Sequence, residues 1–89
     1  MKKLWTDNGW DNYLYWQTQD KKTLKKLNDL IKAIERSPFE GLGKPEPLKH
    51  DLSGWWSRQI DDANRIVYRI KDGNIEISQC KGHYNKNSY

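Results

Sequence analysis

The segment RIVYRIKDGNIEI constrains the fold more than any other part of this 89-residue chain. Apolar and polar residues alternate from Arg65 to Ile70, and such alternation is typical of a β-strand with one buried face. Asp72-Gly73 follows directly, and an Asp-Gly pair between two alternating stretches predicts a tight β-hairpin. We therefore predict a strand from Arg65 to Ile70 and a final, antiparallel strand from Ile75 to Tyr84.

The two faces of the Arg65 to Ile70 strand differ in character. One face carries large apolar side chains and the other carries two arginines: Ile66, Tyr68 and Ile70 on the first, Arg65, Val67 and Arg69 on the second. Charged side chains are seldom fully buried unless they are paired. We therefore expect the first face to meet the core and the second face to stay open and basic.

Two helices are predicted in the first half of the chain. The second helix has the clearer pattern, because five apolar residues recur three or four positions apart on one face: Leu24, Leu27, Leu30, Ile31 and Ile34. Ser37-Pro38 ends this helix, since the residue before a proline leaves the α region. The first helix is capped by Thr6 or Asp7 and runs to Trp16, and a break is expected over Gln17 to Asp20.

Short strands and one long loop complete the predicted order. Lys2 to Trp5 predicts a first strand, and Trp56 to Ile60 predicts a strand that turns through Asp61 to Asn64 into the hairpin. Pro38 to Gly54 is the longest irregular stretch, and loops of this length in small domains are usually functional or disordered. The order β-α-α-loop-β-β-β predicts an α+β fold, with two N-terminal helices packed on one face of a small, mainly antiparallel, twisted sheet.

Composition limits the class of protein. A chain with 35% hydrophobic and 31% charged residues suits one small domain, and no apolar run approaches the roughly 20 residues of a membrane span. Cys80 is the only cysteine, so no intrachain disulfide can form, and a cytoplasmic location is expected. The net charge of +4 predicts a polyanion or an acidic protein as partner, and the lysines of the second helix are interpreted as a solvated face.

The stretch GKPEPLKH holds a single acid, Glu46, between Pro45 and Pro47. Proline fixes its own φ near −65° and pushes the preceding residue toward extended conformations. The backbone at Glu46 is therefore restricted on both sides. Such rigidity suits a carboxylate that must point at one place, although a stiff connector would have the same sequence.

Seven polar side chains are candidates for a common site: Glu46, Lys49, His50, Arg58, Arg65, His83 and Tyr84. No metal site or cofactor is expected, since Cys80 and His83 lack the further ligands that zinc requires. Cleavage of RNA through its own 2′-hydroxyl needs a base, an acid for the leaving 5′ oxygen, and positive charge near the phosphorane. A carboxylate, an imidazolium and an arginine can supply these functions without a metal.

Each candidate also has a purely structural explanation. Glu46 can be a charged residue on a rigid surface loop, and His83 can be a half-exposed surface histidine. Arg65 can pair at the surface with the acids of Asp61-Asp62, where such pairs contribute little to stability. Taken one residue at a time, the sequence leaves these explanations open beside ribonuclease chemistry.

Read together, four segments strongly resemble the YoeB (Txe) toxins of the RelE superfamily: WDNYLYWQ, SPFEGLGKPEPLKHDLSGWWSRQI, RIVYRI and CKGHY. The resemblance covers Met1 to Tyr84 as a single domain and leaves Asn85 to Tyr89 as a short tail. It implies a microbial-ribonuclease-like α+β fold in a toxin of a type II toxin–antitoxin system. It further implies an endoribonuclease, or mRNA interferase, that enters the ribosomal A site, cleaves mRNA by 2′-OH attack without a metal, and inhibits translation.

The resemblance also assigns roles to the candidate residues. It implies that Glu46 is the general base, that Arg65 stabilises the phosphorane, and that His83 and Tyr84 serve as general acid and as a phosphate or base contact. The RNA- and phosphate-binding set it implies is Lys49, Arg58 and His50. Asn64 and Gln59 stand where relatives often carry a histidine and a second arginine; the second of these departures is expected to weaken backbone contacts slightly.

The implied partners are a cognate antitoxin of the YefM or Axe type, the ribosome with its mRNA, and operator DNA through the antitoxin complex. A homodimer is also expected, whereas a membrane is not. We expect an antitoxin segment to cover the open basic face around Arg65 and Lys49. Two other functions stay open: a non-enzymatic basic module that acts with an antitoxin as transcriptional co-repressor, and a ribonuclease active on free RNA.

Overall fold

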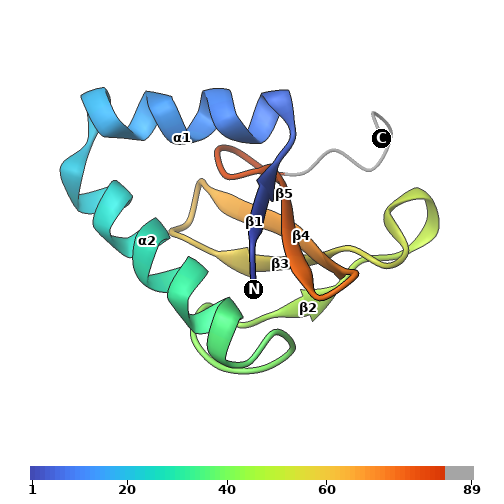
Figure 1. Cartoon of the computed structure of the whole chain (residues 1–89). Coiled ribbons are helices and arrows are strands. Elements are labelled where there is room, and N and C mark those ends of the chain that lie inside the picture. The colour runs from blue at the N-terminus through green and yellow to red at the C-terminus, as the bar shows by residue number, and fades with distance from the viewer. Residues whose placement is uncertain (84–89) are drawn as a thin grey trace.

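The structure is a computed structural model that describes residues 1–83 of the chain. Its helices and strands follow one another along the chain (Figure 1): β1 (Lys3–Trp5), α1 (Asp7–Gln19), α2 (Lys21–Arg36), β2 (Glu46–Pro47), the 3-10 turn η1 (His50–Leu52), β3 (Trp56–Gln59), β4 (Arg65–Lys71) and β5 (Asn74–Gln79). The strands form one sheet in the order β1-β5-β4-β3-β2, in which β1 pairs parallel with β5 and the other pairs are antiparallel. The predicted α+β class is confirmed.

Asp20 alone separates the two helices. Its extended backbone (φ −158°) leaves its N–H to donate to the Trp16 carbonyl at the end of α1, while its carboxylate accepts from the N–H groups of Lys22 and Thr23 at the start of α2. The hydrogen bonds from Thr23 lower the pKa of this carboxyl. The predicted break over four residues is therefore wrong in length, because a single residue caps both helices.

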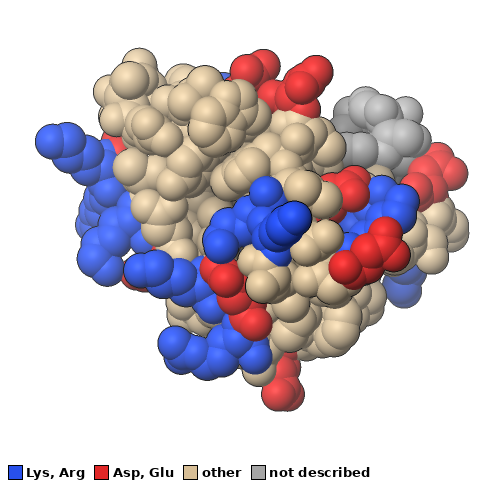
Figure 2. Space-filling model, viewed as in Figure 1, with Lys and Arg blue, Asp and Glu red and all other residues tan. Residues whose placement is uncertain are grey.

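The other helix boundaries follow the predictions. Thr6, one of the two predicted caps, accepts a hydrogen bond from the Gly9 N–H at 3.0 Å, and α2 ends at Arg36 before the extended Ser37. Figure 2 shows basic side chains gathered on the side of the molecule where α2 runs. The lysines of α2 are exposed there, as predicted for a solvated face: Lys21, Lys22, Lys25, Lys26 and Lys32.

The main core lies between the two helices and the sheet. It joins Trp16 of α1 and the apolar stripe of α2 to the sheet face that carries Ile66, Tyr68, Ile75 and Ile77. At Gly9 the two layers approach so closely that an added Cβ would lie 2.5 Å from the Ile77 carbonyl oxygen. Both helices therefore pack on the predicted face of the hairpin.

The final strand is shorter than predicted. β5 ends at Gln79, because side chains of α1 take up the next backbone groups: Trp16 Nε1 donates to the Cys80 carbonyl at 2.8 Å, and Asn12 Oδ1 accepts from the Cys80 N–H at 3.0 Å. Burial raises the pKa of the Cys80 thiol to about 12. This cysteine is consequently an unreactive core residue at neutral pH.

The opposite face of the sheet is not wholly open, in contrast to our prediction. Leu48 and Leu52, from the loop after β2, pack on Val67, and Trp55 covers their edge. Arg69 is paired as well: Nη2 lies 2.9 Å from Glu76 Oε1, and its guanidinium carbon lies 4.5 Å from the centre of the Trp55 ring. The loop leucines thus close part of a face that alternation alone assigned to solvent. Among the described residues, no helix is long and apolar enough to cross a membrane.

Candidate active site

Glu46 lies on β2, which forms where the long loop folds back on β3. Glu46 is the Cα partner of Ser57, Pro47 is the partner of Trp56, and the Leu48 N–H donates to the Trp55 carbonyl at 2.9 Å. A proline is tolerated here because β2 is an edge strand. The Glu46 side chain keeps 51% of its surface exposed, so a short, rigid edge strand presents the carboxylate to solvent.

Arg65, the first residue of β4, reaches across β3 toward Glu46. Its Nη1 lies 3.9 Å from Glu46 Oε1, and its side chain is 25% exposed. Asp61, one of the acids that we considered as an alternative partner, instead accepts from the Ala63 N–H and the Asn64 side-chain amide. The structure therefore brings together two of the predicted site residues from distant parts of the sequence.

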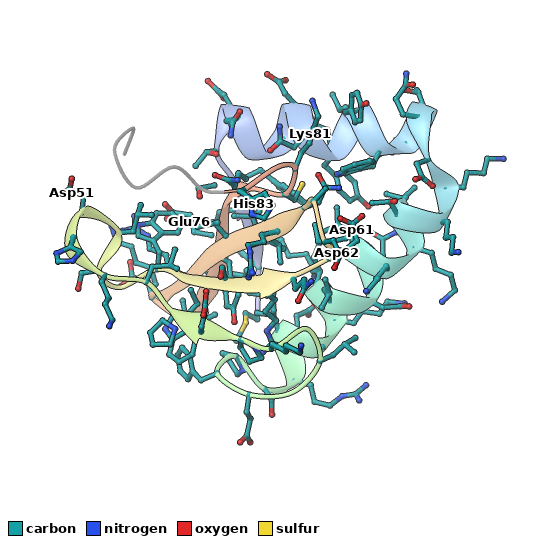
Figure 3. The ribbon with its side chains drawn as sticks, turned by 180° about the vertical axis from the view of Figure 1, so that it is seen from behind. Asp51, Asp61, Asp62, Glu76, Lys81 and His83 are labelled. Carbon is teal, nitrogen blue, oxygen red and sulfur yellow. The ribbon has the colours of Figure 1, made fainter. Side chains whose placement is uncertain are left out.

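Hydrogen bonds fix Gly82, which follows β5, to the start of β4. The Arg65 N–H donates to the Gly82 carbonyl at 3.0 Å, and Asn64 Oδ1 accepts from the Gly82 N–H at 2.8 Å. His83, the next residue, is exposed. In Figure 3, His83 lies between the loop that carries Asp51 and the turn that carries Asp61 and Asp62. Tyr84 lies outside the described residues.

Lys49 and His50 lie on the exposed turn after β2. The Leu52 N–H donates to the Lys49 carbonyl at 3.1 Å, and the Ser53 N–H donates to the His50 carbonyl at 3.0 Å. His50 has φ +57°, a left-handed conformation that is uncommon for residues other than glycine. Both side chains are exposed, so the two predicted phosphate contacts stand at the surface, close in sequence to Glu46.

Arg58 does not lie where a phosphate contact was predicted. It is fully buried, at 0% exposure. Its guanidinium donates to the carbonyls of Ser37, Glu40 and Leu42 and to the Tyr68 hydroxyl. This burial does not fit the predicted phosphate contact, because the side chain faces the core and its donors bind the protein itself.

Sequence reasoning missed several residues of this region. Asn64, which we treated only as a departure from relatives, accepts a hydrogen bond from the Gly82 N–H next to His83. Arg69 and Glu76 are Cα partners across the hairpin, so the Asp-Gly turn would have predicted their pairing. Ser57 could not be found from sequence: its hydroxyl is buried beside the Glu46 strand, and no other described residue forms a hydrogen bond with it. Within residues 1–83, no group of three or more His, Cys, Asp or Glu side chains could hold a metal ion.

Comparison with known proteins decides the family. A model of the YoeB-like toxins of bacterial type II toxin–antitoxin systems matches residues 5–84. This chain belongs to that family. The toxin YoeB of Escherichia coli K12 is 55% identical over 84 residues, which are 94% of this chain and the whole of the relative.

Solved structures of YoeB-family proteins have the same fold. A YoeB/ParE toxin from Agrobacterium tumefaciens has a TM-score of 0.92 at 49% identity, and the match covers 94% of this chain and all of that one. YoeB of Staphylococcus aureus has been solved as a dimer and as a heterotetrameric complex with YefM. In both structures it has a TM-score of 0.87 at 42% identity, with 94% and 98% of the two chains covered.

Proposed function

We propose that this YoeB-family toxin is an endoribonuclease that cleaves mRNA in the ribosomal A site and thereby inhibits translation. The observation that carries the proposal is the convergence of Glu46 and Arg65 across β3, together with the hydrogen bond that joins the Arg65 N–H to the Gly82 carbonyl. His83 directly follows Gly82, which supports the proposal that its imidazole acts together with the carboxylate of Glu46 and the guanidinium of Arg65. These are the three functions that transfer of an RNA phosphodiester to its own 2′-oxygen requires.

In the proposed reaction, Glu46 removes the proton from the 2′-hydroxyl, and the 2′-oxygen attacks the adjacent phosphorus. Arg65 stabilises the added negative charge of the phosphorane, because its planar fork matches phosphate oxygens. The bond from phosphorus to the 5′-oxygen then breaks, and His83 gives its proton to that leaving oxygen. The products are a 2′,3′-cyclic phosphate and a free 5′-hydroxyl, and no metal ion takes part.

Binding of the RNA is assigned to groups around this centre. Lys49 and His50 project from the exposed turn after β2 and are proposed to hold phosphates of mRNA or ribosomal RNA. Tyr84, next to His83 in the sequence, is proposed to contact the phosphate or a base. Arg58 is no longer part of this set, since its guanidinium is buried.

An antitoxin of the YefM type is the proposed partner, because the S. aureus relative has been solved in a complex with YefM. The antitoxin would cover Arg65 and Lys49, and the complex would bind operator DNA. Co-repression with the antitoxin is the second candidate function, and the net charge of +4 is compatible with either role. A homodimer is proposed as well, because Trp10 and Leu14 of α1 are 45% and 42% exposed and the S. aureus relative has been solved as a dimer.

The test is primer-extension mapping of cuts on a translated message. Glu46→Gln and His83→Gln are expected to abolish cleavage and growth arrest without unfolding the protein. Asp51→Asn is the matched control, since Asp51 is an exposed acid on the turn that follows β2. This variant should cleave mRNA as the wild type does. Wild-type rates in both site variants would refute the assignment of these two residues, and absence of cleavage by the wild-type protein would favour the co-repressor function. Loss of activity with EDTA would indicate different chemistry.

A further inference from the structure

The core between the helices and the sheet contains a charged group that the proposed reaction does not use, the guanidinium of Arg58. Arg58 of β3 faces the main core, and a guanidinium stays charged in proteins. A buried charge is tolerated only when it is fully paired, and no carboxylate is hydrogen-bonded to this one among residues 1–83. Instead, Nη1 donates to the Leu42 carbonyl at 3.0 Å, Nη2 donates to the Glu40 carbonyl at 3.0 Å and to that of Ser37, and Nε donates to Tyr68 Oη at 3.0 Å.

These acceptors belong to the segment that connects α2 to β2. The segment 37–45 contains no helix or strand, so backbone ladders do not hold it. Tyr68 adds a second attachment, since its hydroxyl donates to the Pro38 carbonyl at 2.6 Å. Arg58 and Tyr68, neighbours on β3 and β4, thus hold four carbonyl groups of one connecting segment.

The attachment continues to the site through Gly43. Its carbonyl accepts from the Gln59 N–H at 2.7 Å, and a Cβ at this position would lie 2.7 Å from Leu30 Cδ2 and 3.1 Å from the Gln59 carbonyl oxygen. Gly43 also has φ +87°, which favours glycine. The chain therefore enters β2 through one tightly defined point, three residues before Glu46.

We propose that Arg58 is a positioning residue for the Glu46 carboxylate, because its buried guanidinium fixes the connecting segment from which β2 begins. The proposal rests on the proposed ribonuclease function for its catalytic meaning, whereas the attachment itself can be measured in the free protein. The proposal gives a structural role to Arg58, which the sequence analysis predicted to bind RNA or phosphate.

The first measurement is amide hydrogen exchange in Arg58→Lys, with Arg36→Lys as the matched control. A lysine ammonium cannot reach four acceptors at once, whereas Arg36 is exposed at the end of α2. We expect exchange of the Gln59 and Leu48 amides, which bind Gly43 and Trp55, to rise at least tenfold. The Ile75 amide, bound to Lys2 at the far edge of the sheet, should stay within twofold. Equal loosening at Ile75, or no change at Gln59 and Leu48, would overturn the proposal.

The second measurement is single-turnover cleavage of mRNA on saturated ribosomes. Arg58→Lys is expected to lower the cleavage rate at least tenfold and to leave ribosome affinity within twofold, since misplacing a catalytic group by about 1 Å can cost about 10²-fold in rate. A loosened variant that cleaves at the wild-type rate would refute the positioning role. If the wild-type protein cleaves no mRNA, the proposed function is refuted instead. The hydrogen-exchange rates of Gln59 and Leu48 would still show whether Arg58 fixes the connecting segment. If Arg58→Lys does not fold, Tyr68→Phe removes one acceptor and is tested in the same way.

Discussion

Removing a single oxygen atom, in Tyr68→Phe, should destabilise the fold strongly. The Tyr68 hydroxyl accepts from Arg58 Nε at 3.0 Å and donates to the Pro38 carbonyl at 2.6 Å, and the residue is 0% exposed. The substitution leaves a charged donor and a carbonyl without this partner. Unpaired buried groups cost about 1–3 kcal/mol each, so we expect the free energy of unfolding to fall by about 2–4 kcal/mol.

Urea unfolding followed by far-UV circular dichroism measures this loss, and Tyr13→Phe is the matched control. The Tyr13 hydroxyl makes one hydrogen bond, to Asn28 Oδ1 at 2.8 Å, and is only partly buried. Its loss should cost about 0.5–1.5 kcal/mol, the usual net contribution of one hydrogen bond. Tyr68→Phe should also lower Tm by roughly 10 °C or more, given about 4–8 °C per kcal/mol in domains of this size. Equal losses in the two variants would refute the view that Tyr68 and Arg58 form a common buried attachment.

Three further outcomes follow from the packing. Gly9→Ala should lower the free energy of urea unfolding by about 1–3 kcal/mol through overpacking against the Ile77 carbonyl, although alanine normally stabilises a helix. Gln17→Ala on the exposed face of α1 is the control, and a Gly9→Ala protein more stable than the wild type would contradict the close approach of α1 to β5. Burial raises the pKa of Cys80 from 9.0 to about 12, so the thiol loses its proton at lower pH in the unfolded state and the free energy of unfolding falls as pH rises from 9 to 12. In Cys80→Ala, urea unfolding should show a smaller fall of this free energy over the same pH range, and an identical fall would contradict burial of the thiol. Asn64→Ala should slow mRNA cleavage at least tenfold by releasing Gly82, next to His83, whereas Asp62→Ala, in the same turn, should not. Equal cleavage rates in the two variants would show that His83 does not depend on the Gly82 hydrogen bond.

The sequence predicted the elements whose signals are local. The Asp-Gly turn and the alternation before it identified the hairpin, and the spacing of the apolar residues identified α2, because each pattern depends on neighbours a few positions away. The length of β5 was beyond such reasoning, since it is set by side chains of α1 that lie more than 60 residues earlier, with Trp16 and Asn12 binding Cys80 at separations of 64 and 68 residues.

Arg58 was misplaced for a related reason. Arginine is almost never fully buried without a partner. Three of the four hydrogen-bond partners of Arg58 are backbone carbonyls, which every sequence contains and which no motif reveals. Glu46 and Arg65 were both candidates for a common site from their chemistry, and the resemblance to YoeB toxins gave them complementary roles there. Residue by residue, the sequence also allowed a surface pair between Arg65 and the acids of the preceding turn, Asp61 and Asp62.

The parallel pairing of β1 with β5 has a consequence for how the protein is made. Residues 3–5 pair with residues 75–77, so β1 cannot find its partner until a segment 72 positions further along the chain has been synthesised. Helix α1 also cannot complete its packing before β5 has been made, because Gly9 packs against β5 and Trp16 binds Cys80, which follows that strand. A nascent chain can therefore complete this sheet only after residues 75–77 have been made, and pairing between segments so distant in sequence makes folding slower than local pairing would.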